Sequence, residues 1–247
     1  EAAEKAKVAA EANDPSGDSG WQQIVSAASL EDEVKRTRLA FDATVTSPGA
    51  FKSKGHREAR QQLSVLATLF AVINDYTGDI RWKSQAAVAR DLIARTALSC
   101  NAGSTQSYNE AKIRKAELQE LVSGRGFEGR TAEPQNDWAM IVDRTPLMVY
   151  GESLLEALQD DTRDEKSYRA APDDVLRQSE LLAMLGRVLV QEGLDDADDE
   201  DYAAHSNKMS DAAISVLDAI RRDDFDAIRR GVGAISQSCA ACHEDYR

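Results

Sequence analysis

Two cysteines and a histidine near the end of the chain have a spacing that could do chemistry. Cys239 and Cys242 are separated by two alanines, and His243 follows directly. Residues three apart on a helix share a face, so both thiols could reach the two vinyl groups of one porphyrin. The imidazole that follows could bind the iron as its proximal ligand. The Cys-x-x-Cys-His pattern therefore predicts one covalently attached c-type haem.

Two other uses of the pattern fit less well. A structural zinc site normally takes four ligands, and the sequence holds no second Cys/His pair at ligand spacing. A thioredoxin-like redox pair lies in a βαβ setting, and no strands are predicted. The third cysteine, Cys100, has no partner at the required spacing, so we interpret it as an ordinary helix residue.

The composition narrows the class of protein. The chain has 247 residues, 42% of them hydrophobic, with 43 acidic against 30 basic side chains and a net charge of −13. Such a charge argues against a nucleic acid or an anionic membrane as partner and would suit a basic redox protein, although acidic surfaces commonly serve solubility. Three cysteines are too few for a disulfide scaffold. No apolar stretch is long enough to predict a membrane span.

The chain starts at Glu1 without an initiator methionine. Covalent haem of the bacterial pattern is attached outside the cytoplasm. We therefore interpret the sequence as a mature, exported, periplasmic chain whose signal peptide has been removed. A chain trimmed for expression is the alternative.

Helical periodicity predicts an all-α fold of two tandem antiparallel four-helix bundles. Residues 1–20 are interpreted as an N-terminal arm, residues 21–131 as a haem-free bundle and residues 132–247 as the haem-binding bundle, with a glycine-containing linker over 125–136. The helices are expected at 29–46, 56–76, 80–99, 105–123, 137–160, 173–192, 203–221 and from about Asp223 to the end.

The last predicted helix has the clearest pattern. Its apolar residues recur at steps of three and four, which is typical of a bundle core. They are Phe225, Ile228, Val232, Ile235, Cys239 and Cys242. The haem should therefore hang into the core of the second bundle.

The two halves show weak internal similarity in the same order. Residues 34–40 align with 142–148, residues 66–69 with 182–185, and residues 84–87 with 210–213. We interpret this as a duplication in which the first copy has no haem motif. This alignment places Ala40, which cannot bind iron, opposite Met148.

Two segments resemble the cytochrome c′ family, including its cytochrome c-556-like members. Residues 242–247, Cys-His-Glu-Asp-Tyr-Arg, are similar to the family's terminal Cys-His-x-x-aromatic-Arg, and residues 144–151 are similar to its first-helix Arg-x-x-x-Met-x-x-Gly. The resemblance implies that Met148 lies over the distal haem face, opposite His243. Pro146 departs from the pattern and could shift the turn that carries this residue.

The resemblance also implies roles with alternatives. Met148 either binds the iron, as in six-coordinate electron carriers, or only packs, as the apolar residue of five-coordinate gas binders does. Arg144 either pairs with a haem propionate or is a surface charge. Gly151 either lets the backbone approach the porphyrin or serves helix packing.

The remaining candidates are expected to have no role at the iron. Met140, Met184 and Met209 are expected in the core. His56 and His205 are expected to face solvent, with His205 kept as a reserve distal ligand. The acidic stretch 195–201 is interpreted as a solvated connector.

The leading function is single-electron transfer through one covalent haem. A five-coordinate cytochrome c′-like protein that binds NO or CO is the alternative. We do not expect an enzyme, because no distal acid or base is evident. The haem-free half could mimic the second subunit of a dimer, with the halves meeting through the first and second helices of each.

Overall fold

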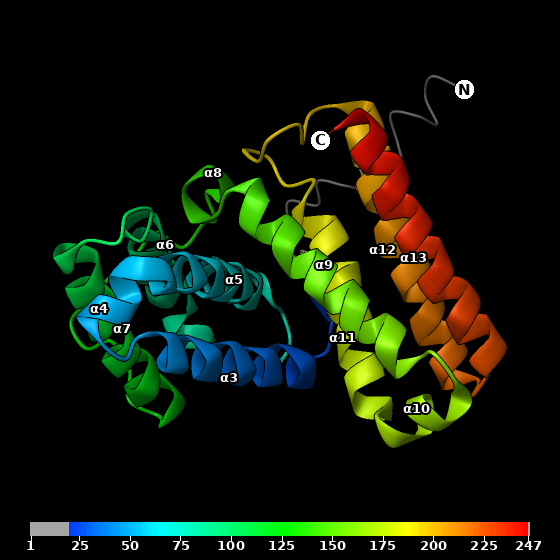
Figure 1. Ribbon diagram of the computed structural model, residues 1–247, viewed down its shortest axis with the longest axis horizontal. Coiled ribbons are helices and arrows are strands. Elements are labelled where there is room, and N and C mark those ends of the chain that lie inside the picture. The colour runs from blue at the N-terminus through cyan, green and yellow to red at the C-terminus, as the bar shows by residue number, and fades with distance from the viewer. Residues whose placement is uncertain (1–19, 247) are drawn as a thin grey trace.

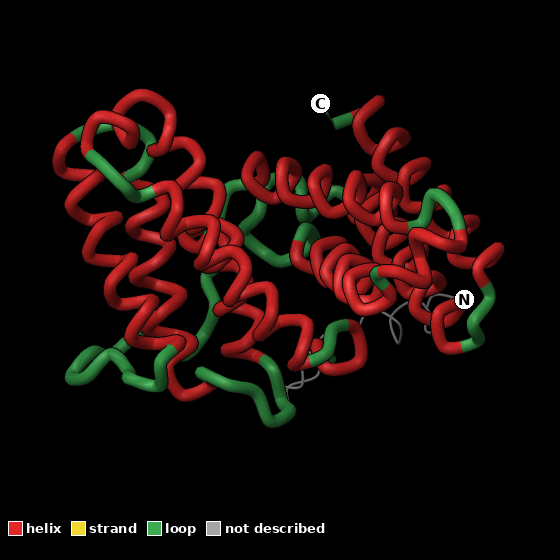
Figure 2. Tube along the Cα trace, turned by 60° about the horizontal axis from the view of Figure 1, so that its bottom comes forward, coloured by secondary structure: helices red, strands yellow, loops and turns green. Residues whose placement is uncertain are grey.

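The computed structural model describes residues 20–246, and every regular element in this range is a helix (Figures 1 and 2). The all-α prediction is therefore confirmed. Apart from Gly20, the predicted N-terminal arm lies outside the described residues. Within the described range, no helix is both long and apolar enough to cross a bilayer.

The first helical group comes from the N-terminal half. Helix α5 packs against α3 and α6, and α7 packs against α3 and α6. Leu63, Leu66 and Leu69 of α5 are fully buried. The elements are α2 (Trp21–Ile24), α3 (Ala27–Thr44), α4 (Pro48–Ala50), the π-helical turn η1 (Phe51–Gly55), α5 (His56–Asp75), the 3₁₀ turn η2 (Lys83–Gln85), α6 (Ala86–Ser99) and α7 (Thr105–Val122).

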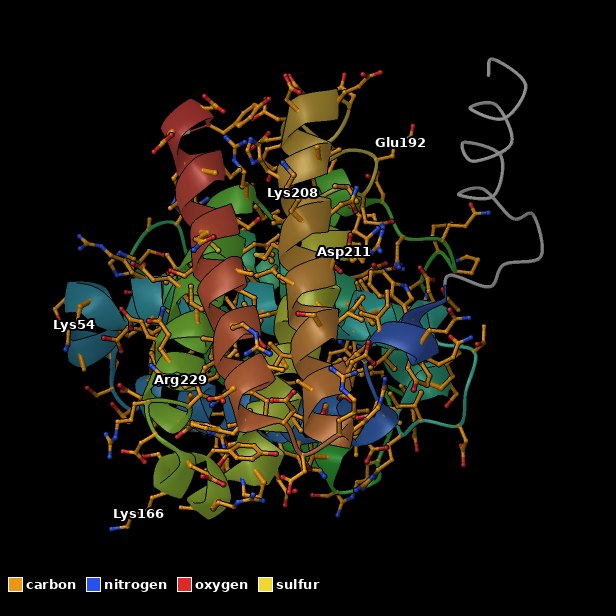
Figure 3. The ribbon with its side chains drawn as sticks, turned by 90° about the vertical axis from the view of Figure 1, so that its right-hand side faces the viewer. Lys54, Lys166, Glu192, Lys208, Asp211 and Arg229 are labelled. Atoms are coloured by element: carbon orange, nitrogen blue, oxygen red, sulfur yellow. The ribbon has the colours of Figure 1, made fainter. Side chains whose placement is uncertain are left out.

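The second helical group comes from the C-terminal half. Helix α12 packs against α11 and α13, and α9 packs against the same two helices. In Figure 3, α12 and α13 stand upright side by side, on the side of the molecule that faces the viewer. The elements are α8 (Trp138–Ile141), α9 (Arg144–Asp161), α10 (Glu165–Ala170), α11 (Pro172–Val188), α12 (Glu200–Arg221) and α13 (Phe225–Asp245).

The prediction of one helix over 137–160 was wrong at its start. The chain breaks at Val142, whose backbone is extended with φ −158° and ψ 145°. A proline ring clashes with the carbonyl four residues earlier, and for Pro146 that residue is Val142. Pro146 is the third residue of α9, where a missing N–H removes no helical hydrogen bond. Helix α9 is therefore regular at Met148, and the expected disturbance by Pro146 falls before the helix.

The same helix start occurs in both halves. Residues Trp21–Val25 and Trp138–Val142 each form one short helical turn and then an extended residue, and they lie 117 positions apart (138 − 21). This offset differs from the sequence alignment, in which residues 34–40 fall on 142–148. The offset of 117 would place Glu31 opposite Met148, whereas the sequence alignment places Ala40 there.

The two groups share one interface and one core. Helix α5 contacts α9, and α3 contacts α11, so α9 lies between the groups in Figure 1. Ser26 Oγ donates to Glu180 across the interface at 2.7 Å, and Glu33, which is 8% exposed, lies 3.5 Å from the Arg177 guanidinium. The buried hydrophobic residues of both groups form one continuous cluster.

The predicted linker over 125–136 is attached to the first group. Arg90 is 2% exposed and donates to the carbonyl oxygens of Glu133 and Gln135 at 2.6 and 3.1 Å and to Asn136 Oδ1 at 2.6 Å. The end of this segment is therefore pinned to α6.

Candidate haem site

Helix α13 carries the cysteine–histidine motif as one uninterrupted helix. It starts with Asp224, whose carboxylate accepts a hydrogen bond from the Ala227 N–H at 2.9 Å. Ile228 and Ile235 are fully buried on the face that packs into the second group. One to two turns further, Cys239 and Cys242 are half-buried free thiols. The stripe predicted from the sequence therefore turns both thiols toward the interior.

A cleft of about 590 Å³ lies where the two thiols emerge. Helices α9, α11, α12 and α13 line it, mostly with apolar atoms. Its volume is within the ~300–1,000 Å³ of ordinary ligand pockets. All six predicted site residues border this cleft: Arg144, Met148, Gly151, Cys239, Cys242 and His243.

The donor set of the cleft fits a c-type haem. Two thiols one turn apart and the adjacent imidazole are on one wall, and the thioether of Met148 comes from α9 on another wall. The apolar walls suit the macrocycle, since burial of apolar surface stabilises a bound porphyrin. The residues present therefore match the group that the motif implies.

Met148 is half-buried in the second turn of α9. It packs against the hydrophobic core and borders a narrow end of the cleft together with His205 and Met209. His243 is exposed at the rim of α13. The two predicted iron ligands thus lie on different helices that face one cleft.

Met209 is a cleft residue that sequence reasoning placed only in the core. Its side chain is 7% exposed, and its Sδ lies 3.8 Å from the Cys239 Sγ. Met184 is fully buried, as expected. The prediction for Met140 was wrong, because the break at Val142 leaves α8 with this side chain 64% exposed.

Arg144 is held by residues of the acidic stretch. Its guanidinium forms an ion pair with Asp196 and lies 5.6 Å from the ring centroid of Tyr202. Asp199 accepts a hydrogen bond from the Tyr246 hydroxyl at 2.7 Å. The acidic side chains of 195–201 are exposed, as expected of a solvated connector, and two of them also pair with Arg144 and Tyr246. In this structure the partner of Arg144 is Asp196, with which a propionate would compete.

Gly151 borders the cleft and lies close to Leu185 of α11, which borders it too. A Cβ built there would lie 2.8 Å from the Leu185 side chain of α11. The missing side chain therefore lets α9 approach α11, which favours the helix-packing interpretation of this glycine.

Both histidines expected to face solvent are largely buried, so that expectation was wrong. His56 is 9% exposed, with its Nδ1 at 3.2 Å from the Phe51 carbonyl across the π-helical turn. His205 Nε2 lies 3.6 Å from Asp245, and its Nδ1 is buried without a hydrogen-bond partner among residues 20–246. His205 lines the narrow end of the cleft, where it is the reserve distal candidate predicted from the sequence.

Burial raises the pKa of both thiols of the motif. It raises the pKa of the Cys239 thiol, and the nearby Cys242 adds to this effect. Burial also raises the pKa of Cys242, against the opposing charge of Arg144. Cys100 is fully buried, far along the chain from the motif, and burial raises its pKa to about 12. All three side chains are therefore thiols at neutral pH in the haem-free chain.

The fold and the motif define a helical c-type haem-binding protein. Residues 197–247, which span α12 and α13, match the family model described as Cytochrome C'. This match supports the cytochrome c′ resemblance for the C-terminal region, and the family implies a c-type haem. Comparisons with curated proteins and with solved structures gave no match.

Proposed function

We propose that the protein is a periplasmic c-type cytochrome that transfers single electrons through one haem. Cys239 and Cys242 would hold the haem through thioether bonds, with His243 and Met148 as the iron ligands. The observation that supports this proposal is that Met148 and the complete motif border the same apolar cleft. When bound, the haem supplies a metal that cycles between ferric and ferrous states.

Side chains that line the cleft would set the reduction potential of the iron and limit its contact with water. A thioether ligand from Met148 stabilises ferrous iron and raises the reduction potential. Leu185, Met209 and Tyr202 keep water from the interior part of the cleft. We propose electron transfer without substrate chemistry, and therefore no enzymatic activity.

A five-coordinate gas binder is the second candidate. The packing of Met148 against the core favours it, because this side chain has a structural role even without iron. The two candidates are separated by the ferric absorption spectrum of the wild type beside Met148→Ala. A low-spin wild type with a methionine–iron charge-transfer band that Met148→Ala abolishes supports the carrier. High-spin iron in both proteins, with ready binding of NO or CO, supports the gas binder.

We also propose that the halves arose by duplication and that the first bundle takes the place of a second subunit. The repeated helix starts at Trp21 and Trp138 support this, as does the interface through α3, α5, α9 and α11. The proposal predicts a monomer by light scattering. A tight dimer through those four helices would contradict it.

A basic redox protein is the proposed partner. Exposed carboxylates lie beside the motif at Glu200, Asp201, Glu244 and Asp245. Salt screens interactions between exposed charges, so electron transfer with a basic partner should slow as ionic strength rises. Periplasmic location would be tested by cell fractionation, in which the haem-containing chain should appear with the periplasmic proteins.

A further inference from the structure

A strongly basic short segment of the chain lies at the start of α5. Residues 51–60 contain Lys52, Lys54, Arg57 and Arg60 against one acid, Glu58, in a chain whose net charge is −13. Lys54 lies at the outer edge of the molecule in Figure 3. The segment includes the π-helical turn η1, a geometry that is frequent at functional sites.

This segment forms one wall of a cavity of about 340 Å³. The cavity lies between the start of α5, the end of α6 and the start of α9. None of its lining residues is a carboxylate. They are His56, Arg57, Arg60, Gln61, Cys100, Asn101, Thr145 and Pro146.

The positive charge of the cavity is only partly neutralised. Arg57 has no hydrogen-bond or ion-pair partner in the described part of the chain, and Arg60 pairs with Asp143, which is half exposed. Since burial raises the pKa of Cys100 to about 12, this wall adds no negative charge at neutral pH. The lining is therefore cationic in an acidic protein.

The cavity is built by tight packing. A Cβ at Gly103 would lie 2.5 Å from the Lys52 carbonyl and 2.9 Å from His56 Nδ1, so the loop after α6 presses directly on the π-helical turn. On the other side α9 begins with no side-chain hydrogen bond from its N-cap residue, Asp143. The first N–H groups of a helix attract anions.

We propose that this cavity binds a small oxyanion of the phosphate type. Arg57 and Arg60 would donate charge-assisted hydrogen bonds, with the buried His56 as a further polar contact. Thr145 borders both this cavity and the haem cleft, so the bound anion would lie next to the distal helix. The site does not depend on the haem, and its test is separate from that of electron transfer.

Calorimetric titration of inorganic phosphate into the full, haem-loaded chain at low ionic strength tests the proposal. We expect saturable binding to one site. Arg57→Gln and Arg60→Gln should each weaken it about tenfold, as expected for loss of one charge-assisted hydrogen bond. Asp143→Asn should tighten it several-fold, because Arg60 loses its internal partner.

Arg163→Gln is the matched control, because it removes the same charge from an exposed site in the loop after α9. Its affinity should equal that of the wild type. Absence of saturable binding would overturn the proposal. Equal weakening by Arg163→Gln and Arg57→Gln would also overturn it, since this would indicate nonspecific electrostatic attraction. Arg57 is exposed, so Arg57→Gln remains informative even if Arg60→Gln perturbs folding.

Discussion

The sulfur of Met209 on α12 lies 3.8 Å from the sulfur of Cys239 on α13. The helix that neighbours the motif therefore contacts the first attachment thiol directly. From this contact and the position of Met148 on α9, we propose different roles for the two cleft methionines.

Met209→Ala should reduce stability without changing iron ligation. Replacing a buried methionine with alanine typically costs about 2–5 kcal/mol. We expect a lower free energy of unfolding in urea, with haem still attached and the ferric spectrum of the wild type. Met148→Ala is the comparison, and only that variant should change the spectrum. A spectral change in Met209→Ala but not in Met148→Ala would indicate that Met209, and not Met148, is the distal ligand.

Gly186→Ala should destabilise the contact between α11 and α12. An added Cβ would lie 2.6 Å from the Ser206 carbonyl, and backbone cannot move away as a flexible side chain can. Overpacking of this kind costs about 1–3 kcal/mol. The drop in melting temperature by calorimetry measures it.

Gly233→Ala is the matched control, because no atom lies within 4 Å of the Cβ that this change adds to α13. Alanine is the better helix former, so stability should rise by up to about 1 kcal/mol. Equal destabilisation by both changes would contradict the packing described for Gly186.

Tyr150 should make the protein sensitive to alkali. Burial, with the charge of Glu33 as a second cause, raises its pKa well above 10 in the folded state. A group whose pKa is raised on folding contributes its full stability below its unfolded pKa and loses it as pH rises further. The free energy of unfolding should therefore fall above pH ~10. Tyr150→Phe should reduce this slope, and an unchanged slope would argue against a buried, protonated hydroxyl.

Glu33→Gln should weaken the interface between the two helical groups. The carboxylate lies 3.5 Å from Arg177, but Arg177 also has Asp174 at 2.6 Å. Because the contact is an ion pair without a hydrogen bond and the guanidinium keeps one partner, we expect a loss of about 1–2 kcal/mol. Urea unfolding followed by circular dichroism measures it. Asp32→Asn, which removes an exposed carboxylate from the same helix, should have little effect.

The sequence signals for the candidate site are local to single helices. The spacing of Cys239, Cys242 and His243 places them on one helix, and the resemblance at residues 144–151 supplied Met148 on the facing helix. All of these residues border one cleft. The contact of Met209 with Cys239 depends on how α12 packs against α13, which the sequence of α12 alone does not specify.

Other features depend on tertiary packing or on sequence signals that the predictions above did not use. The burial of His56 follows from a π-helical turn that no residue pattern indicates. The ion pair of Asp196 with Arg144 joins residues 52 positions apart, which no local pattern indicates. Pro146 is a sequence signal for the break at Val142. The tryptophans at positions 21 and 138 are a sequence signal for the similar short turns that begin there.

The central claim is that one haem is bonded to α13 through two sulfurs. The most direct test is the intact mass of the matured chain under denaturing conditions, beside Cys239→Ala, Cys242→Ala and the double variant. The account predicts that the wild type is heavier than its polypeptide by one haem and that the double variant has the polypeptide mass alone. A wild type with the mass of its amino acids, or a haem adduct that persists in the double variant, would contradict it.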